Sequence, residues 1–249
     1  MKLTALRPLV KLTTLRFKFY PTASRTIGCK WKGLANRLLP LIGILGVWAF
    51  QSIAVASTTW NGPTLNVSTE IPDNDDAGII STQSVFASGI SQIQTVTVTI
   101  NITGTWNGDL YAYLVHDSGF SVLLNRAGRS LDNPDGSAAS GMVVTFADSA
   151  ASDIHTAIPM VGGSFTGTYQ PDGRITDPLT VLNTDSRTAM LSSFSGLNAD
   201  GSWTLFIADQ SPGETSTLQS WSMNITAVPE PSTTMLGCVV MMVLLRRKR

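Results

Sequence analysis

Charge is sorted along this chain into three segments, and the sorting limits what each segment can form. The 249 residues carry 17 Lys and Arg against 17 Asp and Glu, so the net charge is zero. Residues 1–56 nevertheless hold nine basic residues and no acidic one, and the chain ends in four basic residues. Residues 57–228 hold 16 acids, four arginines and no lysine, a net charge of −12. Only this acidic middle segment has the composition of a folded domain.

The composition of the middle segment excludes several functions. Nucleic-acid binding depends largely on Lys and Arg contacts to phosphates, so nucleic acid is excluded as a partner. Both cysteines, Cys29 and Cys238, lie outside the segment, which therefore has no disulfide and no thiolate nucleophile or metal ligand. The absence of lysine also excludes Schiff-base chemistry. About 170 residues suffice for one domain with a sizeable core.

The first segment has the three parts of a secretory signal peptide. A long basic region is followed by an apolar run of 13 residues, Leu38 to Phe50, and then by Ala54-Val55-Ala56. A short apolar run before an A-x-A pattern is typical of a signal that is removed, and we predict cleavage after Ala56. The alternative is a membrane anchor, for which the run is short.

The last segment, residues 229–249, has its own order of parts. Pro229-Glu230-Pro231 is followed by an apolar run from Met235 to Leu245. The chain then ends in Arg246, Arg247, Lys248 and Arg249, which would stay on the cytoplasmic side of a short membrane helix. This order resembles the PEP-CTERM sorting signal. The resemblance implies that an exosortase, a membrane enzyme, recognises the tail, removes it and passes the protein to the cell exterior.

Strand patterns dominate residues 57–228. Between Val96 and Thr103, apolar residues alternate with Thr and Asn, as on a strand with one buried face. Turn sequences such as Asn107-Gly108 and Asp200-Gly201 separate the strands. The pattern predicts an all-β fold, an antiparallel β-sandwich resembling a jelly roll. The other predicted strands are 110–115, 121–124, 142–146, 203–207 and 221–225.

Dispersed sequence blocks of the middle segment resemble the P domain, or homo B domain, of subtilisin-like proprotein convertases. In that family the domain follows the protease domain, and here about 14 residues separate the predicted cleavage site from the first block. The resemblance implies a P domain without its enzyme. It departs from the family where Gly104 stands in place of a common His. The blocks, spanning 71–226, are 71–73 with Gly78, 98–103 leading into Gly108-Asp109-Leu110, 122–124 after a Gly-containing turn, 165–171, 198–205 with Asp209, and 218–223.

No enzymatic site is evident in the middle segment. Its two histidines, His116 and His155, lie in polar turn and loop sequences away from any G-x-S-x-G pattern. We expect both to be exposed loop residues. Most of the aspartates occur in turn sequences, which favours solvated carboxylates over a glycosidase pair. The His-rich metal signatures are absent. We therefore predict a protein that is not an enzyme.

One group of acids is dense enough to suggest a metal. Asp73, Asp75 and Asp76 precede Gly78, and closely spaced oxygen ligands suit Ca²⁺. The EF-hand pattern does not fit, but Asp109 or Asp209 from other loops would complete a calcium site. The alternative is a solvated acidic loop.

Three aromatic residues suggest carbohydrate binding. Trp106 lies in a predicted turn, and Tyr111 and Tyr113 share one face of the following strand. Sandwich modules use such side chains against sugar rings. The alternative, that they pack on neighbouring strands, is the commoner arrangement.

Together these features predict an exported, non-enzymatic protein of the cell surface or extracellular matrix of a Gram-negative bacterium. Its partners would be an exosortase and either an extracellular polysaccharide or a surface protein, and the C-terminal helix would enter the membrane transiently. Two alternatives stay open. One is an accessory domain that acts in trans in a subtilisin-like endopeptidase system, and the other is a carbohydrate-binding module.

Overall fold

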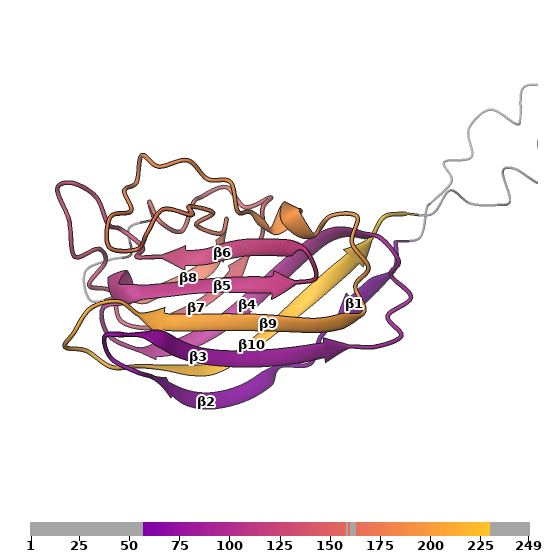
Figure 1. The fold of residues 1–249 in the computed structure, drawn as a ribbon, viewed down its shortest axis with the longest axis horizontal. Coiled ribbons are helices and arrows are strands. Elements are labelled where there is room, and N and C mark those ends of the chain that lie inside the picture. Colours follow the sequence, from indigo (N-terminus) through magenta and orange to yellow (C-terminus); the bar gives the residue numbers. More distant parts are fainter. Residues whose placement is uncertain (1–56, 158, 160–162, 230–249) are drawn as a thin grey trace, which may run out of the picture. The chain divides into compact units, whose positions relative to one another are not determined.

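The computed structural model describes residues 57–157, 159 and 163–229 (Figure 1). The predicted signal peptide with its cleavage site at Ala56, both cysteines and the predicted tail beyond Pro229 lie outside the described residues. Among the residues that are described, no helix is long and apolar enough to cross a membrane.

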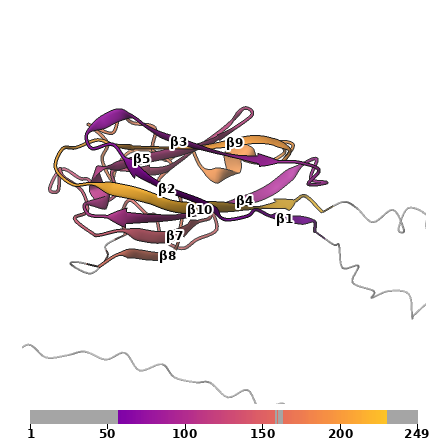
Figure 2. The same cartoon turned by 90° about the horizontal axis from the view of Figure 1, so that it is seen from below.

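Two sheets form the domain. One has six strands in the order β1-β10-β4-β7-β8, with β2 also paired to β10, and the other has four in the order β3-β9-β5-β6. Seen from below, the two sheets lie as separate layers (Figure 2). The six-stranded sheet contains β1 (Thr59–Asn61), β2 (Leu65–Ile71), β4 (Ile93–Gly104), β7 (Met142–Phe146), β8 (Phe165–Tyr169) and β10 (Ser216–Ala227), and the four-stranded sheet contains β3 (Asp75–Val85), β5 (Leu110–His116), β6 (Gly119–Asn125) and β9 (Gly201–Asp209).

The predicted all-β sandwich is confirmed, with one difference in strand direction. Seven of the eight strand pairings in the described residues are antiparallel, but β7 and β8 run parallel, with Val144 level with Gly167. The chain between them, residues 147–164, is long enough to return to the starting end of β7, which a parallel pair requires. The six-stranded sheet is therefore mixed.

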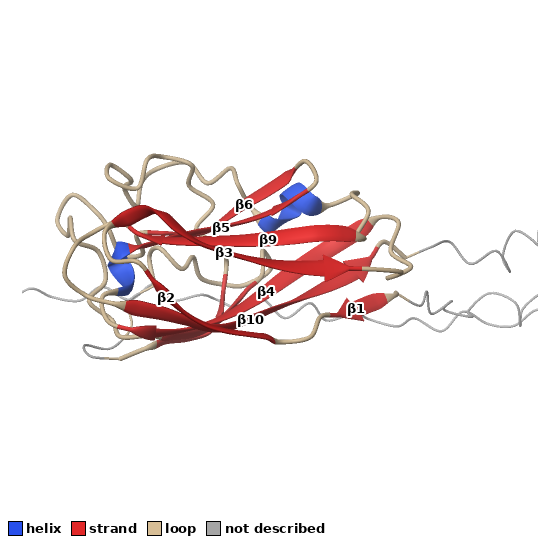
Figure 3. Cartoon of the chain, turned by 60° about the horizontal axis from the view of Figure 1, so that its bottom comes forward, coloured by secondary structure: helices blue, strands red, loops and turns tan. Residues whose placement is uncertain are grey.

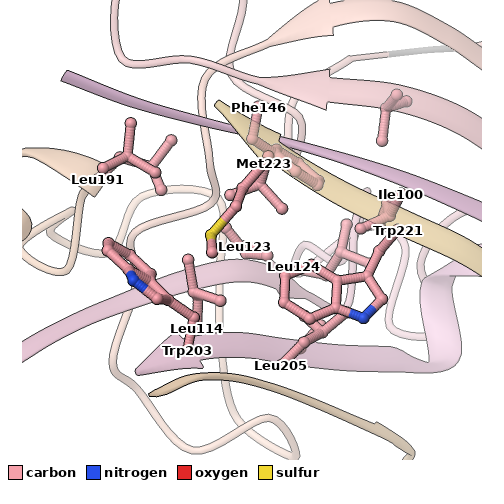
Figure 4. Close-up of a cluster of buried hydrophobic side chains, with 14 of the residues drawn as sticks. Ile100, Leu114, Leu123, Leu124, Phe146, Leu191, Trp203, Leu205, Trp221 and Met223 are labelled. Atoms are coloured by element: carbon pink, nitrogen blue, oxygen red, sulfur yellow. The ribbon is translucent and has the colours of Figure 1, made fainter. Parts of the chain in front are cut away.

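The core lies between the two sheets and follows from the alternation along each strand. Trp221 and Met223 of β10 face Leu114 of β5 and Leu205 of β9 across this space (Figure 4). All four side chains are at most 1% exposed. Burial of such large apolar side chains, each contributing about 1.5–3 kcal/mol, supplies the main driving force for folding.

The chain enters and leaves the described domain at the same end. Thr59 of β1 is level with Thr226 of β10, and the Ser57 hydroxyl donates a hydrogen bond of 3.2 Å to the Ala227 carbonyl. The 12-residue strand β10 begins at the other end, roughly 35–40 Å away at the usual rise per residue. Two short 3-10 helices, η1 (Asn107–Asp109) and η2 (Leu191–Phe194), lie at opposite ends of the strands (Figure 3). The end with η1 is the one far from the two termini.

Candidate functional site

Acidic residues from separate parts of the sequence meet at the η1 end. Asp209, the last residue of β9, is level with Asp75 on one side and with Leu110 on the other, and Asp109 directly precedes Leu110. Gly78 allows β3 to approach β9 closely, because a Cβ on it would lie 2.3 Å from the Ile207 carbonyl oxygen and its φ is +52°. We call Asp73, Asp75, Asp109 and Asp209 the acidic cluster.

Two carboxylates of this cluster are buried, and their pKa values respond to it. Burial raises the pKa of Asp109 to about 6, and the negative charge of Asp209 adds to the rise, while Arg126 opposes it. The pKa of Asp209 is also raised, first by burial, although the Ser211 N–H lowers it and the charge of Asp73 raises it again. Burial is the largest cause of both shifts, so the folded protein favours the protonated form of these two carboxyl groups more than water does.

The positive charge inside the cluster comes from Arg126. Its Nη2 lies 3.2 Å from Asp109 Oδ1 and donates to the Ser211 hydroxyl at 2.9 Å. Its Nε donates to the Gly108 carbonyl at 3.0 Å. The side chain is buried, so this pair is weakly screened by water. Sequence reasoning did not single out Arg126, although its rarity, one of four cations in a lysine-free domain, is a usable signal.

The predicted calcium ligands are only partly brought together. Both carboxylate oxygens of Asp73 accept a hydrogen bond from the Gly213 N–H, at 3.0 and 3.1 Å, and Asp75 Oδ1 accepts one from Ala77. Asp76 is exposed. Within the described part of the chain, no three His, Cys, Asp or Glu side chains are arranged to hold a metal ion. Calcium binding stays a prediction.

A cavity opens beside the acidic cluster, and the predicted aromatic residue Trp106 lines it. Its volume is about 370 Å³, and the indole is 37% exposed. Trp106 has φ 59° and ψ 59°, a left-handed conformation that bulky residues rarely adopt. Its Nε1 donates to the Asp135 carbonyl at 3.3 Å. The lining of this Trp106 cavity consists of Trp106, Asp109, Asp135, Ser211, Pro212, Gly213 and Glu214.

The predicted tyrosines do not reach this cavity. Tyr113 stacks on Phe206 with ring centroids 4.7 Å apart and also contacts Phe120 at 5.3 Å, on the outer face of the four-stranded sheet. Tyr111 meets Tyr113 edge to face at 5.9 Å. Rings that pack against each other in this way present edges rather than a flat platform for a sugar. Of the three aromatic residues, Trp106 alone lines the cavity.

The expectation that both histidines are exposed was wrong. His116 is 4% exposed and stacks on Trp203, with ring centroids 4.0 Å apart. Its two ring nitrogens lie 3.0 and 2.7 Å from the carbonyl oxygens of Ser202 and Asn198. The polar residues around His116 in the sequence suggested a solvent-exposed turn. In the structure, the start of β9 and the residues just before it lie against the ring and supply both carbonyl oxygens.

His155 is fully buried in a network of charges. Its Nδ1 lies 2.6 Å from Asp172 Oδ2, and its Nε2 lies 2.9 Å from the Arg129 carbonyl oxygen. Arg174 continues the network, with Nη1 3.1 Å from Asp172 Oδ1 and Nη2 2.9 Å from Asp153 Oδ2. Burial lowers the pKa of His155, but the hydrogen bond and charge of Asp172 outweigh it, and the pKa is raised.

The two histidines are not placed as catalytic bases. Backbone or carboxylate oxygens contact both ring nitrogens of each imidazole, so neither ring nitrogen is directed at a serine hydroxyl. The His155 network instead ties together loops between the strands. The Trp106 cavity, in contrast, combines a partly exposed indole with three carboxylates that a ligand could reach.

The family comparison covers the last part of the domain. Residues 180–225 match the family model for the proprotein convertase P-domain. The matched span includes η2, β9 and most of β10, together with Asp209 and the 211–214 side of the Trp106 cavity. The resemblance expected over 71–226 is therefore supported for this span, while the blocks before residue 180 lie outside it.

Two solved structures show a distant likeness. A crystal structure of the Aeromonas sobria serine protease in complex with a chaperone is 16% identical to this chain, with a TM-score of 0.39. A structure of the serine protease of A. sobria is 13% identical, with a TM-score of 0.37. The alignments cover 69% and 70% of this chain but 27% of each of those chains, so this chain spans about a quarter of their length. A comparison with curated protein sequences found no match.

The buried His155 network predicts that stability falls as the pH rises. The folded state holds the His155 proton more tightly than the unfolded chain, whose histidine has an ordinary pKa of about 6.5. Its contribution is thus complete below about pH 6.5 and is lost as the pH rises through the raised folded value. Replacing His155→Ala removes one of the two buried partners of Asp172, which keeps Arg174, and should cost roughly 1–3 kcal/mol in mildly acidic buffer.

Urea unfolding of the full chain between pH 5.5 and 8.5 measures this effect. His155→Ala should flatten the pH dependence, whereas the nearby exposed substitution Thr156→Ala should keep it. A wild-type stability that is level or rises across this range would contradict the prediction.

Proposed function

We propose that this chain is an exported, non-enzymatic module with a P-domain-like β-sandwich that works at the cell surface or in the extracellular matrix of a Gram-negative bacterium. The observation that carries the proposal is the P-domain match at residues 180–225. Its strands, β9 and β10, lie within a sandwich whose other strands come from residues 59–169. The described residues thus form the module itself.

The strand arrangement supports display outside the cell. The first and last strands of the domain are paired at one end, so the predicted leader and the predicted sorting tail join the domain at adjacent points. The η1 end, with the acidic cluster and the Trp106 cavity, is at the far end of β10. A domain held to the envelope through its tail would expose this end to partners.

The runner-up proposal is an accessory domain that serves a subtilisin-like endopeptidase in trans. The family match favours it, since the matched family is that of convertase P-domains. The two proposals differ in one measurable respect, because an accessory domain changes the rate of a protease and a display module does not.

Peptide hydrolysis separates the two proposals. The purified full chain is incubated with fluorogenic peptides, alone and mixed with a subtilisin-like protease. We expect no hydrolysis by the chain alone and no change in kcat/KM of the protease, because no described histidine is placed as a base. A heat-sensitive activity that co-purifies with the chain, or a faster protease in the mixture, would support the runner-up and overturn the proposal.

The proposed exosortase sorting is tested in the tail. Proline restricts itself and the residue before it to non-helical conformations, so we expect Pro229 and Pro231 to keep Glu230 accessible to a processing enzyme. We expect Glu230→Ala, or deletion of residues 246–249, to leave the protein unprocessed in the membrane fraction. Immunoblots of membrane and medium fractions measure this, with Thr233→Ala as the control. Normal release of both variants would refute exosortase sorting while leaving the domain's function open.

A further inference from the structure

Each arginine of residues 57–228 is hydrogen-bonded to the domain's own oxygen atoms, so none is free to pair with other acids. Residues 57–228 contain four arginines and no lysine, and none of the four arginines is exposed. Arg129 donates to the carbonyls of Leu179 and Val181, both at 2.6 Å. Arg187 donates to Gln170 Oε1 and to two backbone carbonyls, while Arg126 and Arg174 pair with buried aspartates. The remaining acids therefore have no mobile protein cation to pair with.

The excess of acidic over basic side chains is most concentrated around the Trp106 cavity. Three carboxylates line it, from Asp109, Asp135 and Glu214, and no basic side chain does. The Asp109 side chain is 8% exposed, so it is a buried anion that nevertheless lines the cavity. Arg126 contacts Asp109 and also lies close enough to Asp209 for their charges to interact. Asp209 in turn interacts with the charge of Asp73. One arginine among these acids leaves the cavity negative.

The indole adds a second, independent requirement. Trp106 is 37% exposed, and its ring N–H already donates a hydrogen bond to the Asp135 carbonyl. The ring therefore offers a ligand an apolar, electron-rich face. Cations are attracted to the face of an indole, most strongly when water is partly excluded. A planar guanidinium can stack on such a ring and donate to carboxylates at its edges. Ca²⁺ and Mg²⁺ take oxygen ligands and would make no use of the indole, and neutral sugars would leave the carboxylates uncompensated.

We propose that the Trp106 cavity binds the guanidinium of an arginine side chain on a partner protein, with the indole of Trp106 against its face and the carboxylates of Asp109, Asp135 and Glu214 around it. The cavity of about 370 Å³ is large enough for one such side chain. The shape and charge of the cavity do not depend on the proposed export. The inference extends the proposed function by naming the partner's chemistry: an arginine of a second protein that binds at the end far from the termini.

Close packing on the cavity's inner side supports a preformed site. A Cβ on Gly108 would lie 2.3 Å from Ser137 N and 2.7 Å from the Asp135 carbonyl oxygen, so η1 and the 135–137 turn are in direct contact. The Thr105 hydroxyl donates to Glu214 Oε2 at 2.6 Å and fixes that carboxylate on the opposite side. These contacts hold two of the three carboxylate-bearing segments in place before a ligand binds.

The test is an NMR titration of the full chain in detergent with three short peptides that differ at one position. The probes are acetyl-Gly-Arg-Gly-amide, its lysine analogue and its citrulline analogue, which is neutral but similar in shape to arginine. The reporter is the indole N–H signal of Trp106, identified by its loss in Trp106→Phe. We expect saturable shifts with arginine, weaker ones with lysine and none with citrulline, and affinity that falls as NaCl is added.

Variants then assign the contacts. Trp106→Ala should weaken arginine binding about fivefold, and Trp106→Phe less, as expected for loss of one cation–π contact. Asp135→Asn and Glu214→Gln should each weaken it about threefold, roughly what a partly exposed ion pair contributes. Asp117→Asn removes one negative charge from an exposed turn at the other end of β5 and should bind like the wild type. Signals of the remaining residues report whether each variant is folded.

Several results would overturn the inference. Equal binding of the citrulline peptide would show that the site does not recognise the guanidinium charge. Unchanged arginine binding by folded Trp106→Ala would show that the arginine does not bind in this cavity. Displacement of the peptide by millimolar CaCl₂ but not by NaCl of matched ionic strength would make the cavity a metal site. Binding of a neutral oligosaccharide in place of the peptides would make it a glycan site. A failure of arginine binding with intact export and no hydrolysis leaves the proposed function standing.

Discussion

The structure depends on how four arginines compensate sixteen acids in a domain that has neither lysine nor cysteine. Each arginine is bonded to the domain's own carbonyls or carboxylates, and two of them, Arg126 and Arg174, are nearly buried. The apolar core holds the two sheets together, but the loops at their ends are held by these guanidinium groups. Because a buried charge without a partner is costly, Arg126 and Arg174 fix their loops most strongly. Because the domain has so few cations, its surface is negatively charged.

Two networks of buried charges, one around Arg126 and one around His155, hold the loops of the domain. Arg126 joins the turn before β5, the end of β6 and the loop after β9, which are three segments around the Trp106 cavity. The His155 network does the equivalent work between β7 and the loop that precedes η2. Both networks tie loops of the negatively charged domain together. The Trp106 cavity lies at the end far from the termini.

Local patterns made the sandwich predictable, while long-range contacts did not show in the sequence. Strand β4 alternates strictly because one face is in the core, with Val98 and Ile100 fully buried, and it was predicted closely. Strand β3 was missed, since it starts with two aspartates and exposes Ile80 to 69%. The burial of His155 depends on Asp172 and Arg174, which are far along the chain. For the candidate site, the sequence singled out Trp106 and Asp109 but not Arg126, Asp135 or Glu214.

We infer that Arg126 holds the acidic end of the domain together through its contact with Asp109. A double-mutant cycle with Arg126→Gln, Asp109→Asn and the double variant measures that interaction directly, from the free energies of unfolding of the full chain in urea. For a buried, hydrogen-bonded pair we predict a coupling energy of about 1–3 kcal/mol, nearly independent of added Ca²⁺. A coupling energy near zero, or one that appears only when calcium is removed by a chelator, would contradict the account.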